Sequence, residues 1–319
     1  MRFIITLADV AKESHVSTMT VSRVLHHPEQ VSDEVRQAVQ QAISKLGYKP
    51  SRVGQALSQQ RQFAIQFLIL EDIQQVDPYY AKLLLYIADY LREQGYTLEI
   101  SRDLTDHSSQ VDGTFVSGAR QQDLPLLTKS SDPIVSYGQL DQTIKYVDID
   151  NFQGTYQMTH YLAKCGYQNL LYFGLDLSEA FAISREEGYL QAMTELNKMP
   201  TIFRIDNTEQ AAANLIKQLI ITDNSAIVAA TDRIAIGALQ QLLHLGIKIP
   251  ADVGVTGFDG VFINQISLQH LTTVQQPLKK IAQSMVELLL GMIEKRPGKS
   301  TLIPPQLSIA QTTRALEEK

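Results

Sequence analysis

Four side chains within one short stretch have the chemistry needed to recognise DNA bases: Thr18, Met19, Ser22 and Arg23. An arginine can donate two parallel hydrogen bonds to guanine, and short polar or flexible side chains let a helix come close to the base edges. A helix that enters the major groove by its N-terminal end presents residues at this spacing to the bases. The residue types and their spacing therefore predict a DNA-reading helix.

Two short amphipathic helices, separated by a turn, would position these side chains. Thr6, with Asp9 three positions on, predicts the N-cap of the first helix, and Ser17 predicts the N-cap of the second. The apolar residues expected to face each other are Leu7, Val10, Ala11, Val21, Val24 and Leu25. Helix pairs in ordinary bundles show the same spacing, so a purely structural role is the alternative on this motif alone.

A third helical pattern follows the first two, and it favours DNA binding over a purely structural role for the helix pair. Ser32 predicts its N-cap and Gly47 its left-handed C-terminal residue. Its apolar positions are Val35, Val39, Ile43 and Leu46. After it, residues 48–57 read YKPSRVGQAL, a short helix-like segment behind a proline that leads into a large second domain.

Residues 6–60 resemble the headpiece and hinge of the LacI/GalR family of bacterial transcription factors. The likeness rests on the runs D-V-A, V-S, T-V-S-R-V-L, V-S-D-E and L-G-Y-K-P, in that order. It implies a helix-turn-helix headpiece over residues 1–49 and a hinge helix over residues 50–60, in which Leu57 wedges into the minor groove of DNA. The residues that it assigns to DNA contact are Thr6, Ser17, Thr18, Met19, Thr20, Ser22, Arg23, His26, Ser32, Arg52, Val53 and Leu57.

Two residues depart from the family pattern. His15 occupies the turn position where the family usually has glycine or asparagine, so we expect a left-handed conformation there that glycine would adopt more freely. Gly54 occupies a hinge position that is commonly alanine, and glycine costs about 1 kcal/mol in a helix interior. We therefore expect a hinge helix that folds less readily in the absence of DNA.

The distribution of charge supports a DNA-binding module at the N-terminus. The chain of 319 residues has a net charge of −6, but residues 1–61 contain eight lysines and arginines against five acidic residues. A basic module on an acidic body suits a protein that binds specific sites without coating all DNA.

The cysteine content and the hydropathy of the chain indicate the cellular compartment in which the protein works. The single cysteine, Cys165, excludes an internal disulfide framework and suits a reducing cytosol, where it would be a packing residue. There is no run of about 18 apolar residues, and the apolar residues 3–5 are too few for a signal peptide. We therefore expect a cytoplasmic protein at the bacterial nucleoid, with no membrane contact.

From residue 61 onward, strand-like and helix-like patterns alternate, which predicts an α/β domain of parallel sheets covered by helices on both faces. The predicted strands cover residues 63–70, 97–101, 112–116, 133–137, 169–173, 226–229, 253–256 and 306–311. The predicted helices cover residues 79–93, 152–165, 184–196, 209–221, 232–245 and 283–294. Two doubly wound sheets fit this length.

The family resemblance extends over residues 61–319. It is carried by Asp150-Asn151-x-x-Gly154, by the run at 231–237, by Val255-Thr-Gly-Phe-Asp259 and by the run LTTVQQPL at 271–278. It implies an effector-binding and dimerisation core of two periplasmic-binding-protein-like subdomains, with crossovers near 148, 276 and 303. Small ligands bind outside the carboxyl ends of strands in such sheets, so two facing subdomains would create a cleft there.

By the same resemblance, Arg185 and Asp259 would hold the effector. A carboxylate accepts hydrogen bonds from vicinal hydroxyls and a guanidinium donates to their lone pairs, which suits a small neutral carbohydrate. The alternative is that Arg185 is a solvated helix-face residue and Asp259 a loop cap. By the same resemblance, no aromatic residue occupies the site near Asp206 where some members stack an indole, so Phe181 or Phe258 would substitute. The full effector set is Asp77, Tyr79, Phe181, Arg185, Thr231, Asp232, Phe258 and Asp259.

These observations predict a homodimeric transcriptional repressor that binds near-palindromic double-stranded operator DNA. Its target would be a carbohydrate-utilisation operon, and a small sugar would release it. A galactoside is the first candidate, because the loop at 102–110 and the run at 77–80 resemble the branch of the family that regulates the evolved β-galactosidase operon. A ligand-dependent activator or a corepressor-type regulator is the alternative.

Other classes of protein fit the chain less well. A sugar-carrying protein would not need the headpiece, and none of G-x-x-x-x-G-K-[ST], H-E-x-x-H and G-x-S-x-G occurs, so we expect no enzyme. His26 and His27 are neighbours and would point to different faces of a helix, so we expect no metal, and no cofactor is implied. The tail after residue 311 has no leucine heptads, which argues against a tail-mediated tetramer.

Overall fold

The computed structural model describes residues 5–48, 61–71, 78–105, 110–129, 131–260 and 270–316. The chain divides into two compact units, Met1–Gln62 and Phe63–Lys319. Several predictions fall outside the described residues: the hinge helix with Arg52, Val53, Gly54 and Leu57, the effector candidate Asp77, and the side chain of His26.

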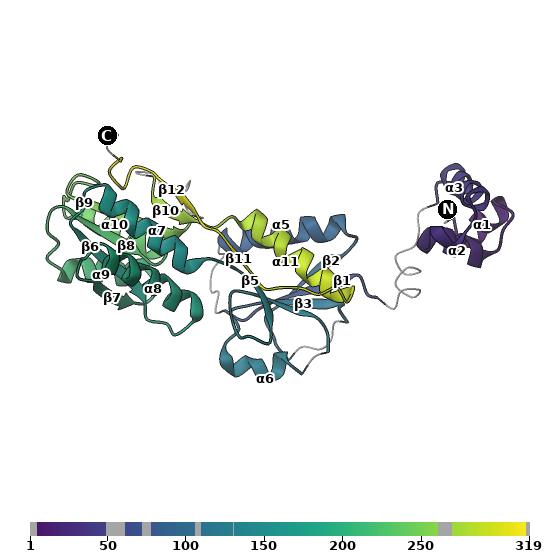
Figure 1. Ribbon diagram of the computed structural model, residues 1–319, viewed down its shortest axis with the longest axis horizontal. Helices are drawn as coiled ribbons and strands as arrows, with labels where there is room; N and C mark the ends of the chain where they lie inside the picture. The colour runs from purple at the N-terminus through teal and green to yellow at the C-terminus, as the bar shows by residue number, and fades with distance from the viewer. Residues whose placement is uncertain are drawn as a thin grey trace. The chain divides into compact units, whose positions relative to one another are not determined.

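The N-terminal unit contains the three predicted helices, α1 (Leu7–Glu13), α2 (Thr18–His26) and α3 (Asp33–Leu46), with a 3-10 turn, η1 (Pro28–Gln30), between the last two (Figure 1). The apolar faces meet in a small core built around Val10, Val21 and Val39, which are fully buried. The predicted helical faces are therefore confirmed.

Local backbone chemistry sets the ends of these helices. Thr6 and Asp9 form a reciprocal capping box, and the Ser17 hydroxyl accepts a hydrogen bond from the Thr20 backbone N–H at 3.1 Å. His15 takes a left-handed φ of 54°, as its turn position predicted, and Gly47 ends α3 with a φ of 63°. The prediction for Ser32 is only half right: it occupies the N-cap position of α3, but its side chain makes no capping hydrogen bond.

The first sheet of the larger unit has six parallel strands in the order β11-β5-β4-β3-β1-β2. Their bounds are β1 (Ala64–Ile69), β2 (Thr97–Ser101), β3 (Gly113–Ser117), β4 (Ile134–Tyr137), β5 (Lys145–Ile149) and β11 (Thr301–Ile303). The main core lies between this sheet and the helices α5 (Pro78–Glu93) and α11 (Leu278–Ile293). A smaller apolar cluster includes residues of helix α6 (Leu124–Leu127), which follows the turn η2 (Gln121–Asp123).

The second sheet also has six strands, in the order β12-β10-β9-β8-β6-β7. Their bounds are β6 (Asn169–Leu175), β7 (Thr201–Ile205), β8 (Ser225–Ala229), β9 (Val253–Asp259), β10 (Thr272–Gln275) and β12 (Gln306–Ser308). Helices α7 (Asn151–Lys164) and α8 (Ala180–Glu195) pack together, as do α9 (Glu209–Gln218) and α10 (Asp232–His244). Cys165 is buried in this core, as expected for a packing residue.

The chain passes between the two sheets three times. It crosses after β5 at Asp150, after β10 at Gln276 and Pro277, and between β11 and β12 at residues 304–305. Each subdomain is thus built from distant parts of the sequence, and α11 and β11 return to the first sheet (Figure 1). This arrangement confirms the α/β fold class with its helix-turn-helix headpiece and two subdomains.

Several elements differ from the sequence prediction. The short strands β5, β7, β10 and β11 and the helix α6 were not predicted, because three to five residues carry too little periodicity. Helix α9 ends at Gln218 because Leu219 is extended, and α11 begins five residues early because Pro277 sets its N-terminus. β12 pairs antiparallel with β10, so the second sheet is not wholly parallel.

None of the helices in the described part of the chain combines the length and the hydropathy needed to cross a lipid bilayer.

Candidate DNA-reading helix and effector site

The N-terminal half of α2 presents an exposed polar surface. Thr18, Met19 and Arg23 are exposed, with 65% of Met19 accessible, while Thr20 and Ser22 are partly exposed. Arg23 lies one turn after Met19, and its Nη2 is 3.8 Å from the Met19 Sδ. Both side chains are therefore available to a groove that accepts this helix.

Three further residues that the sequence predicts to contact DNA lie at the starts of helices. Thr6 precedes α1, Ser17 precedes α2 and Ser32 precedes α3, and all three are exposed. Backbone N–H groups at a helix N-terminus attract phosphate, because they carry the positive end of the helix dipole. Elsewhere in this unit, Lys45 and Glu13 form an ion pair of 2.6 Å that links α3 to α1.

Arg185 is the centre of a buried polar cluster in the second subdomain. It projects from α8 and is only 4% exposed, so it is not a solvated helix-face residue. Its Nε donates to the Asn151 Oδ1 at 2.8 Å, its Nη1 to the Ala230 carbonyl at 2.5 Å, and its Nη2 to the Asp259 Oδ1 at 3.3 Å. The guanidinium thus donates to acceptors from three separate segments of the chain.

The two phenylalanines flank this guanidinium. The Arg185 Cζ lies 3.6 Å from the ring centroid of Phe258 and 5.2 Å from that of Phe181. Phe258 is 1% exposed, and a Cβ added at Gly154 would lie 2.8 Å from its ring. Phe258 is therefore closed off between Arg185 and α7, and the prediction that it offers a stacking face to a ligand is wrong. Phe181 is only partly buried.

Asp259 ends β9 in an unusual backbone conformation. Its φ is 114°, a value that L-residues rarely adopt and that costs on the order of 1–3 kcal/mol. Its Oδ1 accepts from Arg185 and also from the Gln276 Nε2, at 2.8 Å. Such strain is retained where the surrounding bonds hold it, which is typical of a ligand-binding position.

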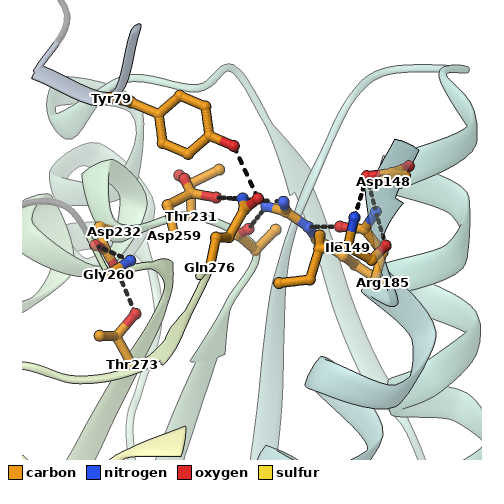
Figure 2. A network of polar contacts seen from close by, with 12 residues as sticks. Tyr79, Asp148, Ile149, Arg185, Thr231, Asp232, Asp259, Gly260, Thr273 and Gln276 are labelled. Carbon is orange, nitrogen blue, oxygen red and sulfur yellow. Dashed lines mark hydrogen bonds and ion pairs between the residues drawn. The ribbon is translucent and has the colours of Figure 1, made fainter. Parts of the chain in front are cut away.

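Gln276 extends the cluster into the first subdomain, as Figure 2 shows. Its Oε1 accepts from the hydroxyl of Tyr79, at the start of α5, at 2.8 Å. It also accepts from the hydroxyl of Tyr137, at the end of β4, at 2.9 Å. Sequence reasoning identified Tyr79 but missed Gln276 and Tyr137. The run LTTVQQPL contained Gln276, and Tyr137 ends a predicted strand, where ligands approach such sheets.

A buried carboxylate lies at the first crossover, beside the same cluster. Asp148 accepts from the backbone N–H groups of Ile149 at 2.7 Å and Gln139 at 3.1 Å, and from the Asn151 Nδ2 at 3.3 Å. Burial raises the pKa of Asp148 to about 6. Burial also raises the pKa of Tyr137 well above its usual range, helped by Asp148, so Tyr137 remains a hydrogen-bond donor.

Thr231 and Asp232 hold the loops around the cluster. Asp232 is fully buried, and its carboxylate accepts from the Thr273 hydroxyl at 2.5 Å and from the Gly260 backbone N–H at 2.9 Å. The Thr231 hydroxyl caps α10 and donates to the Asn207 Oδ1 at 2.7 Å. The contact with Asp232 holds Gly260, the residue directly after Asp259.

A cavity of about 400 Å³ approaches Asp259 and Gln276 from the side of α5 and α11. Its lining includes the lysines Lys82, Lys279 and Lys280. The cavity is large enough for a small ligand. In the part of the chain that the structure describes, no cluster of three histidine, cysteine or acidic side chains could hold a metal ion.

Comparison with known proteins agrees with this architecture. Residues 6–51 match the profile of the lacI family of bacterial regulatory proteins, and residues 159–313 match a periplasmic binding protein-like domain. The HTH-type transcriptional regulator YvdE of Bacillus subtilis is 36% identical, with 97% of this chain and 99% of the relative covered. The ribose operon repressor of Halalkalibacterium halodurans is 30% identical, with 98% of each chain covered.

Solved structures show the same fold over nearly the whole chain. The lac repressor dimer bound to operator and the anti-inducer ONPF gives a TM-score of 0.73 at 24% identity and covers 98% of this chain and 99% of that one. The complex of the transcriptional regulator CelR with cellobiose gives 0.70 at 26% identity and covers 97% and 99%. These relatives are transcriptional regulators rather than enzymes. The chain therefore belongs to the LacI family of bacterial regulatory proteins and carries the DNA-binding domain of that family.

Proposed function

We propose that this regulator is a homodimeric repressor of a carbohydrate-utilisation operon and that a small neutral sugar releases it from DNA. The observation that carries the proposal is the ion pair between the buried Arg185 and the partly buried Asp259, which ends β9, in a hydrogen-bond network that joins both subdomains. A guanidinium and a carboxylate held side by side offer donors and an acceptor to neighbouring hydroxyls.

The charge of the site favours a neutral ligand. The Tyr137 hydroxyl lies in the field of three carboxylates, Asp148, Asp259 and Glu71, and of one guanidinium, Arg185. Since carboxylates outnumber cations around this hydroxyl, the local charge disfavours an anion and leaves acceptors for hydroxyl protons. The relatives named above include a ribose operon repressor and a regulator in complex with cellobiose, both of which point to neutral sugars.

A phosphorylated sugar is the competing effector. Lys82, Lys279 and Lys280 line the cavity that reaches Asp259 from the side of α5 and α11, and ammonium groups attract phosphate. We favour the neutral sugar because Arg185, the one cation of the buried cluster, is already paired with Asp259. A galactoside is our first candidate on the sequence features at 77–80 and 102–110.

The DNA-binding half of the proposal rests on α2. Thr18, Met19 and Arg23 would contact base edges, with Thr20 and Ser22 beside them, and the helix starts at Thr6, Ser17 and Ser32 would meet phosphates. His26, Arg52, Val53 and Leu57 complete the set by family resemblance, with the hinge over residues 50–60 in the minor groove. A dimer would match a near-palindromic operator in the cytoplasm, since the solved lac repressor binds its operator as a dimer.

Calorimetry with the full chain tests the effector class. The panel would contain D-galactose, lactose, cellobiose, D-ribose and galactose 6-phosphate. We expect binding of at least one neutral sugar and none of the phosphate ester. Binding of galactose 6-phosphate alone would overturn the neutral-sugar proposal.

Operator release tests the response to that sugar. An operator selected from a random DNA pool would serve in a gel-shift titration. We expect the sugar that binds to weaken operator binding, and we expect Asp259→Asn to keep operator affinity but lose the response. Asp223→Asn, an exposed carboxylate before β8, is the matched control and should respond as the wild type does. Tighter operator binding with sugar would instead establish a corepressor.

A further inference from the structure

The Gln276 carboxamide joins the two subdomains directly beside the effector anchors (Figure 2). The residue is only 6% exposed. Its Nε2 donates to the Asp259 Oδ1 at 2.8 Å, and its Oε1 accepts from Tyr79 at 2.8 Å and from Tyr137 at 2.9 Å. Asp259 belongs to the second sheet, whereas Tyr79 and Tyr137 belong to the first subdomain. The Gln276 side chain therefore forms hydrogen bonds with polar groups of both subdomains.

The chemistry of these partners determines which way the amide points. An ionised carboxylate only accepts, so the amide NH₂ must face Asp259. The raised pKa of Tyr137 keeps its phenol protonated, so this hydroxyl can donate to the amide oxygen. The amide thus donates at one atom and accepts at the neighbouring one.

Two adjacent hydroxyls on a sugar could make the same three bonds. One hydroxyl would donate to Asp259, and its neighbour would accept from Tyr79 and Tyr137. A protonated amine could donate but not accept, and a carboxylate could accept but not donate. The pattern of Gln276 therefore corresponds to a vicinal diol.

The position of Gln276 in the chain links this amide to the crossover. Its backbone N–H donates to the Asp259 carbonyl at 3.2 Å, and Pro277 follows it at the N-terminus of α11. Any group that displaces the side chain from Asp259 also releases the bonds that tie the second crossover to α5 and β4.

We propose that Gln276 is an internal mimic of the effector: its carboxamide occupies Asp259 and the two tyrosine hydroxyls, and a vicinal diol of the sugar must displace it to bind. This inference rests on the proposed function, because it places a neutral sugar at Asp259. It makes Gln276 a specificity-determining residue, since only a ligand that replaces all three bonds displaces it without leaving a buried polar group unpaired.

The test compares sugar binding in Gln276→Ala and Gln276→Met with wild type by calorimetry, using the same panel of free sugars. Methionine keeps a long side chain but no hydrogen bonds, so it serves if the alanine variant does not fold. Gln191→Ala is the matched control, because Gln191 is an exposed glutamine on α8 that bonds to Glu195 and does not line the cavity beside Asp259. We expect the two Gln276 variants to bind the sugar roughly tenfold or more tightly, because no internal bond has to be broken first. Gln191→Ala should bind as the wild type does.

A second measurement needs no sugar. Amide hydrogen exchange of the full chain would follow peptides that cover residues 276–283 and 78–86. We expect faster exchange in both peptides when Gln276 is replaced, since the bonds that join them are lost.

The outcomes separate the two proposals. If no sugar of the panel binds the wild type, the proposed effector class fails and the mimic fails with it, and faster exchange would then show only that Gln276 ties the two segments together. Weaker sugar binding by both Gln276 variants would show that Gln276 is an ordinary ligand contact and would overturn the inference. Unchanged exchange in both peptides would overturn it as well.

Discussion

Asp148 makes the stability of the larger unit depend on pH. The residue is buried in β5 at the first crossover, and burial raises its pKa from 3.8 to about 6 despite hydrogen bonds that oppose the shift. Because the folded pKa lies above the unfolded one, the stabilising contribution is fully present below 3.8 and is lost as the pH rises through 6. At about 1.4 kcal/mol per pKa unit, the loss amounts to about 3 kcal/mol.

The perturbation that isolates this effect is Asp148→Asn. The amide cannot ionise, but its NH₂ would face the backbone N–H of Gln139 or Ile149, which costs on the order of 1–3 kcal/mol at every pH. The informative quantity is therefore the change in unfolding free energy between about pH 4.5 and about pH 7.5, compared between variant and wild type. The ionisation of Asp148 should lower the wild-type stability by about 2 kcal/mol over this range, and the variant should lack that decrease.

Urea unfolding followed by circular dichroism, at a fixed protein concentration, measures both stabilities. Urea is preferable to guanidinium because it does not screen charges. Asp223→Asn, which alters an exposed carboxylate, should keep the wild-type pH dependence. Equal pH dependence in Asp148→Asn and wild type would refute the assignment of this titration to Asp148.

Three other perturbations test the headpiece, the hinge and the packing around the effector site. Arg23→Ala should relax base preference at one position of each half-site by about 1–3 kcal/mol in binding to a library of operator variants, whereas an equal loss on every sequence would make Arg23 a phosphate contact. Leu57→Ala should reduce DNA bending in a permutation gel assay, and an unchanged bend would remove Leu57 from the minor groove. Gly154→Ala should lower the melting temperature, because its Cβ would lie 2.8 Å from the Phe258 ring and 2.9 Å from Val274, at a cost of about 1–3 kcal/mol. Gly291→Ala, in α11, is the matched control and should raise stability by up to about 1 kcal/mol, because its Cβ would meet the end of the Arg296 side chain at an ordinary contact distance of 4.0 Å.

The headpiece could be predicted in detail because its signals are local. Caps at Thr6 and Ser17, the left-handed His15 and Gly47, and the buried valines all follow from residues a few positions apart. Ser32 is the exception: its position was right, but the hydrogen bond that serine usually makes at an N-cap is missing.

The polar cluster around Arg185, our candidate effector site, was only partly predictable because it is assembled from distant segments. Arg185 and Asp259 were found through family resemblance, and they lie within hydrogen-bond distance. Gln276 and Tyr137 were missed, since nothing in a single sequence shows that positions 139 residues apart share a hydrogen bond. Phe258 was misjudged for a similar reason: Arg185 lies over its ring and Gly154 lies close to the ring, and neither is near it in sequence.

The crossovers explain how a ligand at this site could act on the whole core. Asp148 and Asn151 flank the first crossover and Gln276 forms the second, and all three belong to the network around Arg185. A ligand shifts an equilibrium only by its differential affinity for two arrangements of the protein. If a sugar exchanges bonds with Gln276, as we propose, it would change the contacts at a connection between the subdomains, and its binding free energy would be coupled directly to their arrangement. A ligand that filled the site without touching the crossover residues would bind without this coupling. We therefore expect effector response, rather than effector affinity alone, to depend on Gln276.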